Sequence, residues 1–554
     1  MPILNFKGKS FVQHHHMAVK YHELLPDAKR SMIGNLSLNS NLLVQGDNLS
    51  ALKALLPTYS GNVKCIYIDP PYNTGEEGWI YNDNVNSPMI REWLGKVVDK
   101  EDLTRHDKWL CMMYPRLKLL QEFLSEDGII AIQIDDNEYH NLKAIMDEIF
   151  NEENYINTIC VKMSHLSGMK MSHSDKKIPK IKEYILIYAK NKEKININPV
   201  YVPGNWFDVF DRYTKVLIKD GSRNPEEWEV QNLSDFLKEN GFEKKKINGK
   251  SQYENLAAVE DFCVEHADRI FRTAVNDSLA SLPKDNKFYE VTTATGLEKL
   301  AYNSEEVLFA ETKLQEVDGK LTPVEKIGDI WTDIGINNLH KEGYVEYPNG
   351  KKPIKLVKRI LQAFTKPDSI VLDSFAGSGT TAHAVLDLNN DDNGNRKFIV
   401  IEMEEEVAET ITSKRISTAI KSYENREFEF SYYKVGNPIE VGNLLSGKDL
   451  PKFEDLARYL YFTSTGEEFN PEKINYENNY IGSSKERDLF LFYKQDKEYL
   501  RSTALTLERA TQLNEISTRR KIVFAPMKYL DQEYLDMYKI DFVQLPYEIY
   551  VNKG

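Results

Sequence analysis

Residues 63–75 read VKCIYIDPPYNTG, an apolar run that stops at Asp69 and two prolines. A short run rich in Ile and Val that ends in turn residues is typical of a strand buried in a parallel sheet. Similar runs occupy residues 128–135, 183–189, 368–375 and 397–403. Stretches with helical spacing lie between them, at residues 103–124, 137–150 and 380–388. This alternation predicts an α/β fold, with helices on both faces of a parallel sheet.

The alternation of predicted strands and helices stops after residue 190 and resumes near residue 341. A chain of 554 residues is too long for one core, so several domains are expected. We predict one sheet assembled from two halves, an inserted domain and a small C-terminal α/β domain. Their expected bounds are 1–190 and 341–425 for the halves, 191–340 for the insertion, and 426–554 for the C-terminal domain.

Composition excludes several classes of protein. No apolar run approaches the ~18 residues of a membrane span, and the N-terminus lacks the long apolar stretch of a signal peptide, so a soluble, cytoplasmic protein is expected. The four cysteines form no CxxC pair, so we expect neither a zinc site nor a disulfide framework. The adjacent His14, His15 and His16 are interpreted as a polar surface segment, and no metal site is predicted.

The tetrapeptide Asp69, Pro70, Pro71 and Tyr72 follows the first predicted strand. Ligands of α/β proteins bind at the carboxyl ends of strands, so these residues are catalytic candidates. A carboxylate and a rigid backbone carbonyl can hold the hydrogens of an exocyclic amine, and proline stiffens the loop that aims the carbonyl. Tyr72 could stack on a base rotated out of a duplex. An ordinary turn with a buried tyrosine remains the alternative.

A second motif follows the strand at residues 368–375, where a loop of glycine and hydroxyl residues runs into a helix. Glycines at such a turn allow the backbone to approach a ligand closely. The next strand ends at Glu402, where an acid can bind ribose hydroxyls. These features predict an adenosine-like ligand. The chain contains no GxxxxGK[ST] phosphate loop and thus no recognisable ATP motor.

The motifs DPPYNTG and DSFAGSGTT, in this order, resemble those of DNA amino-methyltransferases, and most closely the modification (Mod) subunits of type III restriction-modification systems. Residues 41–57, 182–191, 331–334 and 352–361 are also similar to segments of that family. The resemblance implies a Rossmann-like sheet that binds S-adenosyl-L-methionine, and a target recognition domain in the insertion. It also implies binding of double-stranded DNA, a homodimer, and a separate ATP-dependent restriction subunit.

Roles for individual residues follow from the same resemblance. Asp69 and the Pro70 carbonyl would hold the target amine, Tyr72 would stack on the base, and the methyl group would move directly to adenine N6. Because the family variant with Ser in place of Asp69 is associated with cytosine N4, Asp69 favours adenine without deciding the choice. The expected cofactor-binding residues are Asp47, Asp373, Phe375, Ala376, Gly377, Ser378, Gly379, Thr380 and Glu402.

Two basic runs could bind DNA although the net charge is −14. The first run comprises Lys162, Lys170, Lys176, Lys177, Lys180 and Lys182. The second comprises Lys351, Lys352, Lys355, Lys358 and Arg359. The insertion mixes aromatic and basic residues suited to bases and phosphates: Trp206, Arg212, Lys215, Lys219, Arg223, Trp228, Lys244, Lys245, Lys246 and Lys250. An oligomerisation role for the insertion, or a solvated surface for either run, is also compatible with the sequence.

Two other functions remain compatible with the sequence. The first is a methyltransferase that acts on cytosine N4 or on adenine in RNA. The second is a DNA-recognition subunit without catalytic activity, which the intact motifs at Asp69 and Gly377 disfavour.

Overall fold

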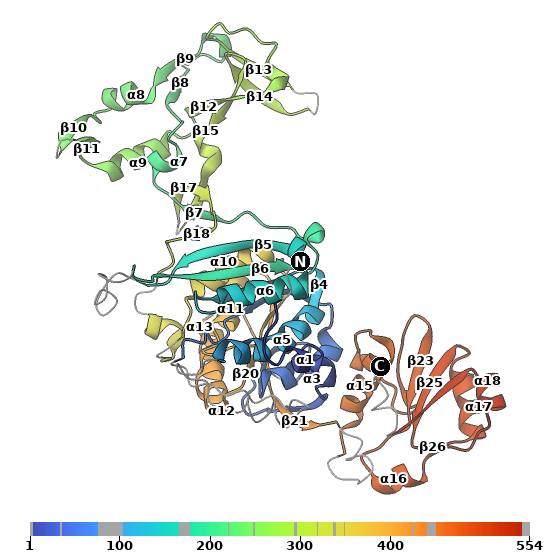
Figure 1. Cartoon of the computed structure of the whole chain (residues 1–554). Coiled ribbons are helices and arrows are strands. Elements are labelled where there is room, and N and C mark those ends of the chain that lie inside the picture. The colour runs from blue at the N-terminus through green and yellow to red at the C-terminus, as the bar shows by residue number, and fades with distance from the viewer. Residues whose placement is uncertain are drawn as a thin grey trace. The chain divides into compact units, whose positions relative to one another are not determined.

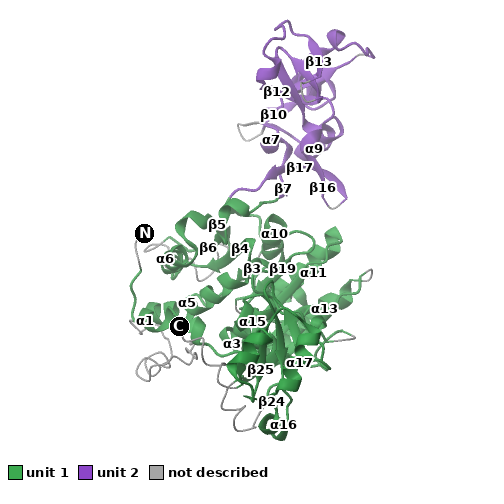
Figure 2. Ribbon diagram, turned by 90° about the vertical axis from the view of Figure 1, so that its right-hand side faces the viewer, with its two compact units in different colours: residues 1–198, 329–554 green, residues 199–328 purple. Residues whose placement is uncertain are grey.

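The computed structural model describes residues 4–33, 36–75, 104–164, 178–219, 221–247, 250–292, 296–317, 319–335, 339–347, 350–423, 426–439 and 450–545. The chain forms two compact units (Figure 2), which are Met1–Asn198 with Asp329–Gly554, and Pro199–Gly328. The inserted unit is shorter at both ends than the expected range 191–340.

In the first unit, ten strands among the described residues form one sheet in the order β1-β21-β2-β20-β19-β3-β4-β6-β5-β18. Figure 1 labels β4, β5, β6, β18, β20 and β21 of this sheet. They are β1 (His22–Pro26), β2 (Asn41–Gln45), β3 (Val63–Ile68), β4 (Leu124–Ile134), β5 (Tyr155–Lys162), β6 (Lys182–Ala189), β18 (Ile330–Trp331), β19 (Ile370–Asp373), β20 (Lys397–Glu402) and β21 (Phe430–Pro438). The two sequence halves therefore meet where β19 lies beside β3.

The sheet is mixed, which corrects the expectation of a parallel sheet. The strands from β21 across β2, β20, β19 and β3 to β4 are parallel to one another. By contrast, β6 runs back alongside β5 and is antiparallel to both β5 and β4, and β1 is antiparallel to β21. A buried apolar run has the same appearance in either direction, so periodicity could not reveal this reversal.

Helices pack in two layers. One layer holds α3 (Asn48–Tyr59), α5 (Arg105–Phe123) and α6 (Tyr139–Phe150), whose apolar residues share a core with alternate residues of β3 and β4. The other holds α10 (Ile354–Phe364), α11 (Thr380–Asp392) and α13 (Ser413–Ser422), which pack against one another. All six residues of β3 are buried, so its carboxyl end is held rigidly at the edge where Asp69 follows.

The inserted unit has its own cores and, among its described residues, a two-stranded antiparallel sheet of β10 (Lys244–Ile247) and β11 (Lys250–Tyr253) besides two larger antiparallel sheets. The larger sheet contains β8 (Lys215–Ile218), β9 (Glu229–Asn232), β12 (Ile270–Val275), β13 (Phe288–Thr292), β14 (Glu298–Tyr302) and β15 (Glu305–Phe309). The smaller one contains β7 (Tyr201–Pro203), β16 (Leu314–Val317) and β17 (Lys320–Lys326). The composition of the insertion had suggested that Trp206 stacks on a base. Trp206 is fully buried in this unit, so it cannot do so.

The C-terminal region contains a smaller sheet in the order β22-β23-β25-β27, formed by β22 (Tyr480–Ser483), β23 (Arg487–Leu491), β25 (Arg520–Ala525) and β27 (Ile540–Gln544). The expected boundary at residue 426 is wrong, because β21 belongs to the ten-stranded sheet.

None of the helices in the described ranges combines the length and the apolar character required to cross a membrane.

Candidate active site

The two motifs meet at one edge of the main sheet. Strands β3 and β19 are parallel neighbours, with Cys65 beside Val371 and Ile66 beside Leu372. Their carboxyl ends open on a cavity of about 480 Å³. It is lined by Tyr67, Asp69, Pro70, Pro71, Tyr72, Tyr347, Gly350, Lys352, Asp373, Phe375, Ala376, Gly377, Ser378, Thr380, Thr381, Glu402 and Glu404. Residues far apart in the sequence thus form one site.

Hydrogen bonds with α5 and with Glu138, the N-terminal cap of α6, hold the loop after Asp69. The indole Nε1 of Trp109 donates to the carbonyl of Pro71 at 2.7 Å. Asn73 is fully buried with a left-handed φ of 58°, and its side-chain amide donates to Glu138. His106 Nδ1 lies 2.6 Å from the same carboxylate. The loop is therefore a fixed platform for the residues that line the cavity.

Asp69 has one engaged and one free carboxylate oxygen. Oδ2 lies 3.1 Å from the ammonium group of Lys352. Oδ1 is buried and has no hydrogen-bond partner among the described residues. Burial raises the pKa of Asp69 to about 6, and the nearby Lys352 limits the rise. A buried acceptor without a donor costs free energy, so Oδ1 is suited to a donor brought by a ligand.

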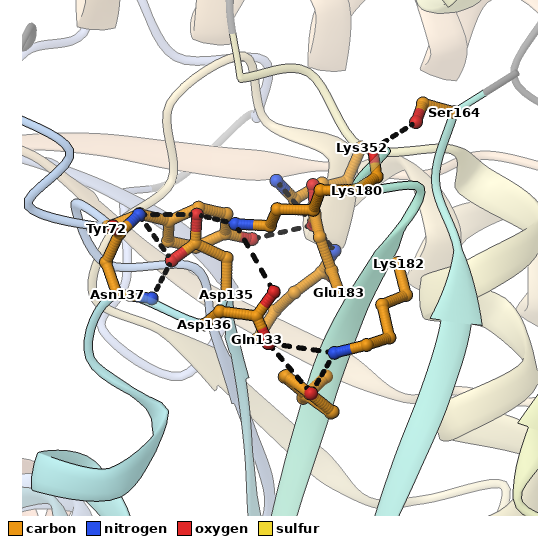
Figure 3. Close-up of polar contacts among 11 residues, drawn as sticks. Tyr72, Gln133, Asp135, Asp136, Asn137, Ser164, Lys180, Lys182, Glu183 and Lys352 are labelled. Carbon is orange, nitrogen blue, oxygen red and sulfur yellow. Dashed lines mark hydrogen bonds and ion pairs between the residues drawn. The ribbon is translucent and has the colours of Figure 1, made fainter. Parts of the chain in front are cut away.

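Glu183 at the start of β6 lies next to Tyr72, Gln133 and Lys352 (Figure 3). Its Oε2 accepts hydrogen bonds from the hydroxyl of Tyr72 at 2.8 Å and from the amide of Gln133 at 2.6 Å, and it lies 3.4 Å from Lys352 Nζ. Burial raises the pKa of the Tyr72 hydroxyl well above its ordinary value, so Tyr72 is a neutral donor. Sequence reasoning did not single out Glu183, although it lies in the family-like segment at residues 182–191, nor Gln133, which lies inside an apolar strand.

The glycine loop on the other side of the cavity has the backbone that its sequence predicts. Gly377 and Gly379 have positive φ values of 49° and 79°. Asp373 accepts hydrogen bonds from the amide of Phe375 at 2.9 Å and from the hydroxyl of Thr381 at 2.5 Å. Burial raises the pKa of Asp373 to about 7. The carboxylate thus fixes the turn from β19 into α11.

The end of β20 supports the same loop. Glu402 accepts hydrogen bonds from the amide of Gly377 at 2.7 Å and from that of Glu404 at 2.9 Å. On the opposite side, the buried guanidinium of Arg415 in α13 donates to Ser378 Oγ at 2.9 Å and to Thr380 Oγ1 at 2.8 Å. Sequence reasoning did not single out Arg415, since no motif marks it.

Two of the expected cofactor-binding residues do not line the cavity. Asp47 caps α3, where its carboxylate accepts a hydrogen bond from the amide of Ser50 at 2.9 Å and lies 3.4 Å from Arg116. Gly379 is the N-terminal cap of α11 and packs near Thr412. The other residues expected to bind the cofactor line the cavity.

Lys180 and Lys182 of the first basic run are paired with acids. Lys180 lies 2.5 Å from Asp135, and Lys182 lies 2.8 Å from Asp136 (Figure 3). Lys162 is half-buried on β5. Lys170, Lys176 and Lys177 lie outside the described residues.

The basic residues of the inserted unit are more exposed. Lys245 is exposed and lies 2.5 Å from Glu254. Lys215 is half-buried, with its ammonium group 5.3 Å from the centre of the Tyr302 ring. Trp228 is half-buried beside Phe288, and Lys219 lies 4.6 Å from the centre of its ring. DNA contact by these residues stays a prediction.

The second basic run is not an open positive surface, so that interpretation is corrected. Lys351, Lys352 and Arg359 are all buried. Arg359 donates two hydrogen bonds to Asp333, and Lys358 lies 2.5 Å from both Asp387 and Asp391. The fold thus turns most of these positive charges toward acids that are distant in the sequence.

The cavity has an acidic balance. Asp69, Asp373, Glu402 and Glu404 line it together with one lysine, Lys352. This balance favours a ligand that carries positive charge. Among the described residues, no group of three or more His, Cys, Asp and Glu side chains could hold a metal ion.

A comparison with known families agrees with this arrangement of motifs. A family model described as DNA methylase (N6_N4_Mtase) matches residues 63–413, more than half of the chain. The chain belongs to this DNA methylase family. The matched range includes both motifs, Lys352 and the whole inserted unit.

Individual relatives point to the same family. The probable type III restriction-modification enzyme HindVI Mod subunit of Haemophilus influenzae is 31% identical, over 75% of this chain and 55% of that protein. The type III restriction-modification enzyme EcoPI Mod subunit of Escherichia phage P1 is 30% identical, over 69% of this chain and 62% of that protein. The chain therefore spans less than two thirds of the length of these relatives.

The solved structure of a putative DNA modification methylase from Thermus thermophilus is 14% identical over 72% of this chain and all of that one. The TM-score between the two structures is 0.32.

Proposed function

We propose that this DNA methylase transfers the methyl group of S-adenosyl-L-methionine to the N6 amine of adenine in double-stranded DNA. The observation that carries the proposal is the free Oδ1 of Asp69, a buried acceptor in the same cavity as the glycine loop. An amine that donates a hydrogen to Oδ1 would lie beside the pocket formed by that loop. Such proximity of acceptor and donor sites is what a direct transfer between two bound molecules requires.

The glycine loop and the acids around it fit S-adenosyl-L-methionine. This molecule supplies a methyl group bonded to a positively charged sulfur, and the acidic cavity suits that charge. Gly377 has a left-handed φ of 49°, which glycine adopts without strain, and a Cβ there would lie in contact with Tyr347, 3.7 Å from its Oη, so its absence leaves room at the cavity. Glu402 would bind the ribose hydroxyls, and Phe375 and Ser378 would complete the pocket. Asp47, which caps α3 instead, would contribute only from outside the cavity.

Residues of the chain would then act on the amine. Asp69 and the carbonyl of Pro70 would hold its hydrogens, and the half-buried ring of Tyr72 would contact the base. The nitrogen gains positive charge as its bond to the methyl carbon forms, and it then releases one proton. The Asp69 carboxylate, with its pKa raised to about 6, is positioned to stabilise that charge and to accept the proton.

The choice of adenine and of the biological system rests on likeness. The relatives' names describe Mod subunits of type III restriction-modification enzymes. We therefore assign this chain to the same role, with a separate ATP-dependent restriction subunit and a homodimer as its partners. The inserted unit, Pro199–Gly328, would serve as the target recognition domain, with Lys215 and Lys245 among its DNA contacts. Lys162, Lys170, Lys176, Lys177 and Lys180 would contribute contacts from the first unit.

The decisive experiment supplies the purified chain with S-adenosyl-L-methionine labelled on the methyl group and with duplex DNA of mixed sequence. Label should enter the DNA, and digestion to nucleosides should yield N6-methyladenine. Label in N4-methylcytosine would overturn the choice of base, and transfer to RNA alone would overturn the choice of polymer. No transfer to either polymer, with intact cofactor binding, would favour a recognition subunit without catalytic activity.

A further inference from the structure

Lys352 lies in a position that its sequence context did not suggest. It precedes α10 in a run of basic residues, yet its side chain is 9% exposed and lines the cavity. Its backbone carbonyl accepts a hydrogen bond from Thr380 Oγ1 at 3.2 Å, which attaches it to the glycine loop. Lys352 thus connects the cofactor half of the site to the target half.

The ammonium group of Lys352 bridges two carboxylates. Nζ lies 3.1 Å from Oδ2 of Asp69 and 3.4 Å from Oε2 of Glu183. It also lies 4.8 Å from the centre of the Tyr72 ring, within the range of a cation–π contact. A buried ammonium group needs such compensation, and removing it would leave two partly buried acids without this counterion.

The pairing is selective for one oxygen of Asp69. Lys352 engages Oδ2, whereas Oδ1 is buried with no partner among the described residues. The side chain of Asp69 is therefore held at Oδ2, whereas its buried Oδ1 lacks a donor from the part of the chain that the structure describes.

We propose that Lys352 is a positioning residue for methyl transfer, which holds Asp69 ionised and presents its free Oδ1 to the target amine. Glu183 is the second acid that pairs with Lys352. It fixes Lys352 through the second ion pair and ties the Tyr72 hydroxyl to the same cluster. The inference rests on the proposed function, because it assigns a role within the same reaction.

The charged groups around Asp69 determine the pH at which the activity should be lost on acidification. Burial is the largest cause of its raised pKa; Lys352 opposes the rise and Glu183 adds to it. The titratable and charged groups near Asp69, from all elements packed around it, are Tyr67, Tyr72, Glu183, Tyr347, Lys352 and Asp373. Removing Lys352 should therefore raise the pH at which activity is lost on acidification, and neutralising Glu183 should lower it.

A competing role for Lys352 is to bind the carboxylate of the methionine portion of the cofactor. The two roles differ in what a substitution changes. A positioning residue for Asp69 affects the turnover rate at saturating cofactor, whereas a cofactor ligand affects cofactor affinity.

The principal test compares Lys352→Met with the wild-type full-length chain in labelled methyl transfer to DNA and in calorimetric titration with S-adenosyl-L-methionine. We expect kcat to fall by about 100-fold, with an acidic limb of the pH–kcat profile displaced to higher pH and little change in cofactor affinity. Lys64→Met is the matched control, since Lys64 is also a buried lysine that pairs with an aspartate, Asp127, at 2.9 Å and lies outside the cavity. Undiminished kcat, or a loss confined to cofactor affinity, would overturn the inference.

If Lys352→Met does not fold, Glu183→Gln provides a second test of the role of Lys352. Glu183→Gln preserves hydrogen-bonding groups toward Tyr72 and Gln133 but removes one negative charge beside Asp69. Its acidic limb should move to lower pH than that of the wild-type chain, opposite to the shift for Lys352→Met. An unchanged limb or a shift to higher pH would refute the arrangement. Absence of transfer by the wild-type chain would instead refute the proposed function, so the two failures are distinguishable.

Discussion

The backbone amide of Gly377 donates a hydrogen bond of 2.7 Å to Oε2 of Glu402, which ties the glycine loop after β19 to the end of the adjacent strand β20. The acid thus shapes the loop before any ligand binds. Its second oxygen accepts a hydrogen bond from the amide of Glu404, so both oxygens have fixed positions.

Glu402→Ala should weaken binding of S-adenosyl-L-methionine by about tenfold or more, because it removes charged hydrogen bonds worth roughly 1.5–3 kcal/mol each at such sites. Calorimetric titration measures the change directly. Glu406→Ala is the matched control, since Glu406 is an exposed acid shortly after the same strand and does not line the cavity. Equal dissociation constants for Glu402→Ala and the wild-type chain would contradict the role given to Glu402.

Asp69→Asn should reduce methyl transfer by about 100-fold or more, because an amide lacks the negative charge that would stabilise the amine as it becomes cationic. Cofactor affinity should change little, since the glycine loop is untouched. Incorporation of labelled methyl groups and calorimetry separate the two effects.

Asp127→Asn is the control for Asp69→Asn, because Asp127 pairs with Lys64 outside the cavity, as Asp69 pairs with Lys352 inside it. If Asp69→Asn retains wild-type turnover, Asp69 is not the group that holds the amine.

Sequence periodicity and motif chemistry predicted the main strands and both loops of the site. The run after residue 63 becomes β3, and Asp69 and Gly377 line one cavity because β3 and β19 are parallel neighbours. This succeeded because buried parallel strands have a strong apolar signature and because ligand sites lie at their carboxyl ends.

Partners that are remote in the sequence could not be predicted. Lys352 has the appearance of a surface charge in a basic run, yet it is buried because the fold brings Asp69 and Glu183 beside it. Arg415 and Gln133 likewise acquire their roles only through tertiary contacts. A one-dimensional pattern reports which residues are charged, but not which opposite charge each will meet.

Asp373→Asn should stabilise the chain at neutral and alkaline pH. The folded-state pKa of Asp373 is about 7, above its ordinary value of 3.8, because burial disfavours the charged form. Its contribution to stability is therefore greatest below pH ~4 and is lost as the pH rises toward ~7. Asparagine does not titrate, and its amide can still accept from the amide of Phe375 and donate to Thr381. The gain should be on the order of 2–4 kcal/mol at pH 8 and should shrink at lower pH.

Urea unfolding of Asp373→Asn and of the wild-type chain between pH 5 and pH 8, at about one-unit steps, measures this difference. Asp127→Asn is the control, because burial tends to raise the pKa of Asp127 but the hydrogen bonds from Lys64 and Ser125 and the charge of Lys64 lower it overall, so that this carboxylate does not titrate in the measured range. Its stability relative to the wild-type chain should not improve as the pH rises. A gain for Asp373→Asn that is the same at every pH would show that titration of Asp373 is not its source.

Arg415→Met should weaken both the fold and the cofactor pocket. The guanidinium group of Arg415 is fully buried and donates to the hydroxyls of Ser378 and Thr380, which line the cavity. Its removal leaves these hydroxyls without their donor and leaves Glu342 without its ion pair. We expect a loss of about 3 kcal/mol in the free energy of unfolding and a clear loss of affinity for S-adenosyl-L-methionine.

Arg396→Met separates these two effects. Arg396 is also buried, but it bonds to Thr365 and pairs with Asp392 at 2.8 Å, and neither partner lines the cavity. It should lose a similar amount of stability, as measured by urea unfolding, and keep the wild-type affinity for the cofactor in calorimetry. If both variants lose affinity equally, the loss reflects general destabilisation; if neither does, the contacts of Arg415 with the glycine loop do not shape the pocket.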